Sequence, residues 1–378
     1  MLHFTPAEFE ARRAGLRAEM ARRGLEAMLI FSPESQYWAT GYDTFGYCFF
    51  QCLVIDHMGE ALLTRSADLR QAELTSTLTD IQVWKDEAGA DPTADLACLL
   101  AARGLGGARI GVETDTHGLT ARWGAALAAR LPGLVEASDL IARLRLVKSP
   151  AEIAFCRKAA EIGDACYLGA LDLIGPGAEE AAILAAMQGG VFAAGGDYAG
   201  NEFIIGSGDH ALLCRYQTGR RRLDAEDQLT LEWAGVWRRY HAALMRTVVI
   251  GAPRPEHLSM HAAAKDALLA CEAALKPGRP MGEVFDAHAR ALDAAGFGAA
   301  RLNACGYALG ARFSPSWMEP FMFYEGAEEV MAPGMVFFLH MILMDSESGA
   351  AMSLGRTSLV TEAGAEPMSA LPLELAVR

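Results

Sequence analysis

The sequence LEWAGVWRRYHAALMRT, residues 231–247, has the pattern of a β-hairpin that carries a single acid. Glu232 alternates with Ala234 along the first strand, whereas Leu231 and Trp233 fall on the other face. Because successive side chains of a strand point to opposite faces, Leu231 and Trp233 are expected to pack in a core and Glu232 to point away from it. The hairpin therefore predicts a buried sheet with one acid on its second face.

Length and composition indicate a globular protein of two domains. The chain has 378 residues, of which 52% are hydrophobic and 21% charged. A net charge of −14 argues against a nucleic-acid partner, because contact with a phosphate backbone needs a basic face. No secretory signal is visible, and no apolar run approaches the roughly 18 residues of a membrane span. We therefore expect a cytoplasmic protein without a membrane partner.

The eight cysteines include no C-x-x-C pair, and most lie in apolar contexts. Buried free thiols in a reducing compartment are the expected state. The roles of Cys214 and Cys305 are left open. Cys214 directly precedes Arg215, and Cys305 lies two positions before Tyr307.

Alternating helical and strand patterns predict a small α/β domain over residues 1–142 and a second, catalytic domain over residues 143–378. Strands are expected at residues 26–32, 46–55, 60–64 and 108–113, and helices at 5–24, 91–103 and 119–131. Near the border, Ser149 and Glu152 form a capping box with Pro150 at the first helical position. This arrangement predicts the start of a long helix.

Two Pro-Gly pairs indicate an internal duplication in the second domain. Pro176-Gly177 and Pro277-Gly278 each interrupt helical sequence, and strand-forming sequence follows each of them. Such an echo predicts a pseudo-twofold α/β (α+β) domain with its site in the cleft between the halves.

Together these features resemble the pita-bread fold of the creatinase, prolidase and aminopeptidase P superfamily. The resemblance covers the whole chain and rests on the ordered segments KSPAEI, SGDHALLCRY, YHAALMRT, CGYALG, APGMVFFLH and SLVTE. It implies a creatinase-like N-terminal domain followed by the duplicated catalytic domain. It also implies a homodimer, in which residues 41–47 of one subunit close the cleft of the other.

Peptidases of this superfamily hold two divalent ions with two aspartates, one histidine and two glutamates. The matching positions are Glu232, Ala243, Tyr307, His340 and a position at or near Gly355. Dinuclear sites for hard cations need several carboxylate oxygens, and a single carboxylate remains. We therefore expect no metal and no other cofactor, with a mononuclear Glu232/His340 site as the alternative.

Two metal-independent branches of the superfamily share this loss. Creatinase has the same alanine, but its working histidine falls on Arg215 and its two glutamates on Met245 and His340. Ectoine hydrolase resembles the chain more closely, although Arg215 again replaces a histidine. The shared segments are GYD (41–43), GGDY (195–198), the Glu232 strand with RYHA, CGY (305–307) and Pro315-x-Trp317. This resemblance implies metal-independent hydrolysis of a C–N bond in a small zwitterion, with ectoine-type ring opening as the leading reaction.

The remaining polar residues suggest roles around such a substrate. Glu232 is expected to act as a general base or nucleophile, because desolvation raises the proton affinity of a carboxylate that no metal holds. Tyr307 and His340 are expected to manage protons, and Arg215 to clamp a substrate carboxylate. The other residues expected to bind substrate are Asp197, Tyr240, His241, Phe313 and Trp317.

Each role has a structural alternative that the sequence leaves open. Glu232 and Arg215 can serve in salt bridges, Asp197 can cap a turn, and the histidines and aromatic residues can be satisfied in the core. At the level of function, the alternatives are an Xaa-Pro dipeptidase or aminopeptidase, a creatinase-like amidinohydrolase, and a non-catalytic protein that binds a small ligand.

Overall fold

The computed structural model describes residues 2–216 and 219–378 and divides into two compact units, Met1–Arg145 and Leu146–Arg378. The division falls three residues beyond residue 142, where the sequence suggested a border. In the described part of the chain, no helix is both long and apolar enough to cross a membrane.

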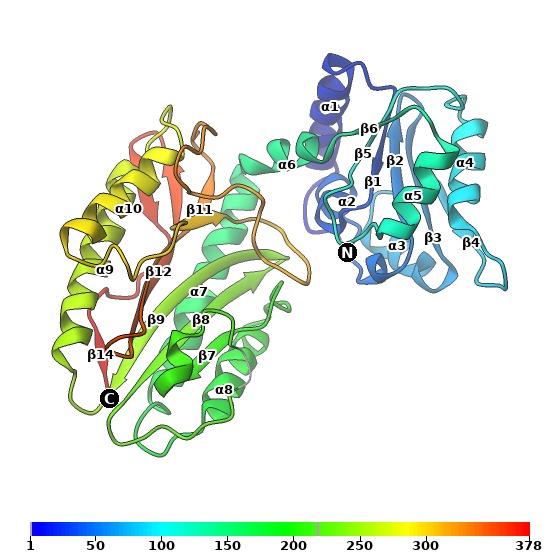
Figure 1. Ribbon diagram of the computed structural model, residues 1–378. Helices are drawn as coiled ribbons and strands as arrows, with labels where there is room; N and C mark the ends of the chain where they lie inside the picture. Colours follow the sequence, from blue (N-terminus) through cyan, green and yellow to red (C-terminus); the bar gives the residue numbers. More distant parts are fainter. Residues whose placement is uncertain (1, 217–218) are drawn as a thin grey trace. The chain divides into compact units, whose positions relative to one another are not determined.

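The N-terminal unit is a mixed sheet with helices on both faces (Figure 1). Its strands follow the order β4-β3-β2-β1-β5-β6, with β1 antiparallel to β2 and parallel to β5. One face packs on α4 and α5, and the other on α1, α2 and α6. The strands are β1 (Ala27–Ile30), β2 (Cys52–Asp56), β3 (Gly59–Arg65), β4 (Ile81–Trp84), β5 (Ile110–Val112) and β6 (Leu134–Glu136). The helices are α1 (Pro6–Arg22), α2 (Pro33–Thr40), α3 (Leu69–Thr75), α4 (Pro92–Ala102), α5 (Ala121–Arg130) and α6 (Ser138–Leu146).

The strand expected over residues 46–55 is wrong in its first half. Gly46–Cys48 forms a short 3-10 helix, and β2 begins only at Cys52. The Thr44 hydroxyl accepts a hydrogen bond from the Gly46 backbone N–H at 2.8 Å, which favours a turn over strand pairing. Phe49 is exposed and lies under the guanidinium of Arg65, so its aromatic character does not indicate a buried strand.

The C-terminal unit is built on one larger sheet with the strand order β10-β11-β12-β9-β8-β7. Two further strands pair at the side of this path, β13 with β12 and β14 with β9. The strands are β7 (Ile204–Ser207), β8 (Asp227–Trp237), β9 (Tyr240–Ile250), β10 (Gly306–Ala308), β11 (Val336–Asp345), β12 (Ala350–Thr361), β13 (Gly364–Pro367) and β14 (Ala376–Val377). The helices are α7 (Pro150–Leu171), α8 (Glu180–Ala193), α9 (Pro255–Ala274) and α10 (Gly282–Ala294).

The expected duplication is present in the C-terminal unit. In each half, a long helix, a second helix, a short strand and two long strands follow one another, coloured green in the first half and yellow to red in the second (Figure 1). Gly177 and Gly278 lie between the paired helices in the left-handed region, with φ of 81° and 78°, where glycine avoids the steric cost of a side chain. Their backbone N–H groups make equivalent hydrogen bonds of 2.8 Å, to the carbonyl oxygens of Leu223 and Met331.

Strand alternation puts Trp233 on the face of this sheet that α7 covers and Glu232 on the opposite face. On β8, Trp233 faces α7 and its indole N–H donates to the Gly163 carbonyl at 2.9 Å. A Cβ at Gly235 would lie only 1.8 Å from the Ala159 carbonyl oxygen, so glycine lets α7 approach this closely. The capping box of Ser149 and Glu152 starts α7 as the sequence predicts. Glu232 consequently points to the face that α7 does not cover.

Candidate functional site

Glu232 is joined to β10 through Tyr307. The Tyr307 hydroxyl donates to Glu232 Oε1 at 3.3 Å, and the hydroxyl oxygen in turn accepts the indole N–H of Trp317 at 2.8 Å. Trp317 is only 1% exposed, and its backbone N–H donates to Asn201 Oδ1 at 3.1 Å. Trp317 therefore orients the phenol toward Glu232, and Asn201 holds Trp317 in place.

Burial perturbs the carboxyl group of Glu232. Desolvation raises its pKa from about 4.5 to about 7, while the nearby charge of Arg215 and the hydrogen bond from Tyr307 act in the opposite direction. The side chain still keeps partial solvent exposure. A carboxyl group with such a pKa exchanges a proton readily near neutrality, as a general base or acid requires.

His340 lies on the same side as Tyr307, with ring centroids 5.7 Å apart. Its backbone N–H donates to the Cys305 carbonyl at 3.0 Å, which fixes β11 beside the segment that leads into β10. Burial lowers the pKa of the imidazole to about 3, so the ring is neutral near pH 7. This neutral state argues against the expected proton shuttle by an imidazolium. Nδ1 is buried without a hydrogen-bond partner in the described chain, so its hydrogen-bonding capacity is unused.

Arg215 and Cys214 border Glu232 from the turn that follows the short helix Gly208–Leu212. The positive charge of Arg215 lowers the pKa of Glu232. The pKa of the Cys214 thiol is raised mainly by desolvation, and the negative charge of Glu232 raises it further. Arg215 is exposed, and it forms no ion pair with a residue that the structure describes. It is therefore placed to bind an anionic group near Glu232. Cys305, in contrast, is fully buried in the core.

Tyr240 and His241 hold the β8–β9 hairpin to the rest of the unit. The buried Tyr240 hydroxyl donates to Glu152 Oε1 at 2.6 Å, which links the hairpin to the first turn of α7. His241 Nε2 accepts the Gly200 N–H at 2.9 Å, and burial lowers its pKa to about 3. Both side chains are enclosed and bonded to protein atoms, so the structure favours structural roles over the expected contact with substrate.

Asp197 and Phe313 also take structural positions. Asp197 Oδ2 accepts the backbone N–H of Arg239 at 3.1 Å, which caps the turn between β8 and β9. Phe313 is buried, and the guanidinium of Arg239 lies 4.8 Å above its ring. Trp317 likewise contacts Tyr307 rather than lining an open wall. Of the residues predicted from the sequence, Glu232, Tyr307, Trp317, His340 and Arg215 are brought together.

Sequence reasoning missed Asn201. It lies in a loop 116 positions before Trp317, and neither residue has a local pattern that indicates their hydrogen bond. Its neighbour Gly200 bonds to His241, so this loop is fixed at two points close to the Glu232 network. Only the three-dimensional arrangement identifies it as a support for the site.

The donor set does not fit a dinuclear metal centre. Among the described residues, no group of three or more His, Cys, Asp or Glu side chains is arranged to hold a metal ion. Gly355 pairs with His340 across β11 and β12, and a Cβ there would lie 2.8 Å from both Phe338 Cε2 and the Leu339 carbonyl oxygen. The ring of Phe338 thus occupies the space that a side chain at residue 355 would need. One carboxylate, one phenol and one neutral imidazole are a poor set for hard cations.

Comparison with known proteins is consistent with this architecture. The model of metallopeptidase family M24 matches residues 154–362, and that of the creatinase/prolidase N-terminal domain matches residues 12–147. The chain is 28% identical to ectoine hydrolase from Halomonas elongata over 401 aligned positions, covering 100% of this chain and 99% of that protein. It is 24% identical to Xaa-Pro dipeptidase from Pyrococcus furiosus, covering 63% and 67%. The crystal structure of dipeptidase PepE from Mycobacterium ulcerans superposes with a TM-score of 0.87 at 25% identity, covering 99% of each chain.

Proposed function

The chain belongs to metallopeptidase family M24, and on that premise we propose that it is a metal-independent hydrolase of a C–N bond in a small zwitterion. Cyclic amidines of the ectoine type are the leading substrates. The observation that carries the proposal is the carboxyl of Glu232, whose pKa burial raises to about 7 and which accepts the Tyr307 hydroxyl. The similarity over full length to ectoine hydrolase supports the substrate class.

The proposed reaction adds water to the amidine carbon. Glu232 removes a proton from the attacking water, and a tetrahedral carbon forms. If Glu232 attacks the carbon itself, one water then hydrolyses the ester-type intermediate and the products are the same. When one C–N bond breaks, the carbon keeps the oxygen as an amide. Both protons of the water end on the departing nitrogen, which leaves as an ammonium group. Glu232, with a pKa of about 7, carries a proton from the oxygen to that nitrogen near neutral pH.

Tyr307 and Arg215 assist at two ends of the substrate. Trp317 fixes the position of the Tyr307 oxygen, so the phenol O–H needs only to turn from Glu232 to the charge that develops on the substrate. The guanidinium of Arg215 offers paired donors to the carboxylate of a zwitterion. His340, with a neutral ring and an unpartnered Nδ1, offers a hydrogen bond to the substrate rather than a charge.

Turnover with and without a chelator tests the proposal. Protein dialysed against a chelator and analysed for manganese, zinc and cobalt is assayed on ectoine, hydroxyectoine, creatine, amidino acids and Xaa-Pro dipeptides. We expect ectoine-type turnover that is unchanged by the chelator, lost in Glu232→Gln, and kept in Glu226→Gln, which changes an exposed acid just before β8. Dipeptide hydrolysis that requires added metal would refute the proposal. Binding of these compounds without turnover would instead identify a non-catalytic protein.

A further inference from the structure

A cavity lies in the C-terminal unit, between the end of α8 and the loop of residues 197–203. Its volume is about 230 Å³, which is ample for a small organic ligand. Glu232, Tyr307 and His340 are not among the residues that line it, so it is distinct from the site proposed above. The loop that forms one wall carries Asn201, which also holds Trp317.

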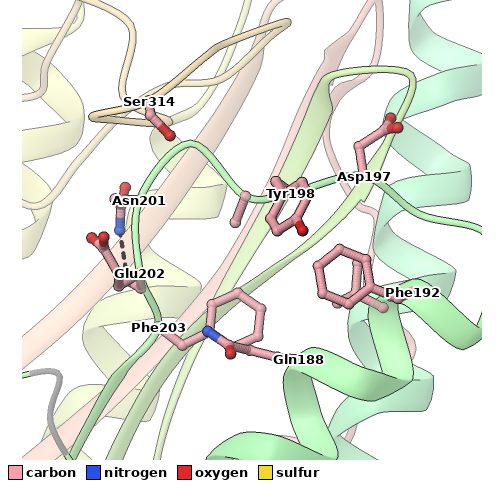
Figure 2. Close-up of a pocket in the computed structure, with 10 residues that line it drawn as sticks. Gln188, Phe192, Asp197, Tyr198, Asn201, Glu202, Phe203 and Ser314 are labelled. Atoms are coloured by element: carbon pink, nitrogen blue, oxygen red, sulfur yellow. Dashed lines mark hydrogen bonds between the residues drawn. The ribbon is translucent and has the colours of Figure 1, made fainter. Parts of the chain in front are cut away.

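Aromatic rings dominate the wall of this cavity. Phe192 and Tyr198 pack edge to face with ring centroids 4.8 Å apart, yet they are 45% and 75% exposed. Phe203 lines the cavity from the opposite side and is buried against Trp317. Figure 2 shows these three rings and the amide of Gln188 around one common space. Large aromatic side chains exposed around a cavity are typical of a binding site.

The charged residues that line the cavity in the described part of the chain are both acidic. Asp197 and Glu202 lie at opposite edges of the cavity in Figure 2, and no described lysine, arginine or histidine lines it. The guanidinium of Arg239 is turned to the ring of Phe313, which is not a lining residue. Aromatic faces carry negative electrostatic potential, so the rings and the two carboxylates favour the same sign of ligand charge.

We propose that this cavity binds a small organic cation, an ammonium group that carries alkyl substituents. The faces of Phe192, Tyr198 and Phe203 contact the alkyl groups, over which the positive charge is spread, and the carboxylates of Asp197 and Glu202 attract it from the edge. The amide oxygen of Gln188 accepts a hydrogen bond from a ligand that bears an N–H or O–H group. Neither binding nor selectivity requires Glu232.

Choline and its neutral carbon isostere, 3,3-dimethylbutan-1-ol, separate charge from shape. We expect the full chain to bind choline about 10-fold more tightly than the isostere at constant ionic strength, as measured by saturation-transfer NMR titration. Tyr198→Leu and Phe192→Leu are each expected to weaken choline binding about 2- to 5-fold, because each removes one ring face. Tyr324→Leu is the matched control, since Tyr324 is also exposed but lies outside the cavity.

The outcomes decide the proposal independently of catalysis. Equal affinity for choline and the isostere would show a merely apolar cavity and overturn the cation site. Choline binding that is absent, or that neither ring substitution weakens, would place the ligand elsewhere and overturn it as well. Glu232→Gln is expected to bind choline as the unchanged protein does, so loss of turnover and loss of this site are told apart.

Discussion

Replacement of Glu232 by glutamine should make the protein more resistant to alkaline pH while it removes activity. In the folded protein the pKa of Glu232 is about 7, against about 4.5 for an ordinary glutamate. A folded pKa above the unfolded one means that the folded state binds the proton more tightly. The stability contributed by this group is therefore complete below about pH 4.5, falls as the pH rises through about 7, and is constant beyond.

The magnitude follows from this rise in pKa. At about 1.36 kcal/mol for each pH unit, charging Glu232 in the folded state costs about 3 kcal/mol above pH 7, and most of that cost is still absent at pH 5. Partial solvent exposure reduces this figure. We therefore expect the difference in free energy of unfolding, Glu232→Gln minus the unchanged protein, to be about 2 kcal/mol larger at pH 9 than at pH 5. The glutamine is neutral at both values, so any constant effect of the substitution cancels.

Hydrogen exchange of peptides that cover β8 and β9 measures this difference within the C-terminal unit. Comparing the two proteins at the same pH cancels the intrinsic exchange rate. The ratio of their slowest exchange rates should change about 30-fold between pH 5 and pH 9, which corresponds to about 2 kcal/mol. Glu226→Gln should show no such change. A ratio that is the same at both pH values would show an ordinary carboxyl group at residue 232 and remove the basis of the proposed catalysis.

The supporting residues give three more expectations. Tyr307→Phe removes a hydrogen bond that favours the charged carboxylate, so the pKa of Glu232 should rise. The acidic limb of the pH–rate profile should then move to higher pH, and an unmoved limb would exclude Tyr307 from the network. Trp317→Phe removes the indole N–H and should lower kcat about 2- to 10-fold with KM unchanged, whereas a change in KM alone would indicate a substrate wall. Tyr240→Phe removes the buried hydrogen bond to Glu152 and should lower the free energy of unfolding by about 1.5 to 3 kcal/mol. The loss should appear as faster hydrogen exchange of β9 amides, while kcat is retained. A large loss of kcat would show that Tyr240 acts in the active site.

The elements predicted best are those that local physics determines. The capping box at Ser149 starts a helix at the expected residue, and the alternation around Glu232 gives a strand with the expected inner and outer faces. The two Pro-Gly pairs mark matching loops because glycine accepts the positive φ that each loop needs. In all of these, the deciding interaction joins residues a few positions apart.

The roles that sequence could not decide depend on partners distant in the chain. Tyr240 has the sequence surroundings of a turn residue, yet its hydroxyl bonds to Glu152, 88 positions away. Trp317 fits a ring-binding wall by type, but its indole N–H reaches Tyr307 within a buried cluster. His340 fits a proton shuttle by its ordinary pKa, and only the burial of its ring shows that it stays neutral. A residue type states what a side chain can do, and its neighbours select among those possibilities.

The ring of Phe338 beside Gly355 also limits which side chains residue 355 can carry. A glutamate introduced at residue 355 would collide with that ring before it met any cation, and overpacking of this kind is destabilising. A smaller residue at position 338 alone would leave a void next to Tyr307, at a similar cost. Each single substitution lowers stability, so an acidic side chain at residue 355 requires a coordinated change at residue 338. The two positions are thereby coupled, and we expect them to vary together or not at all.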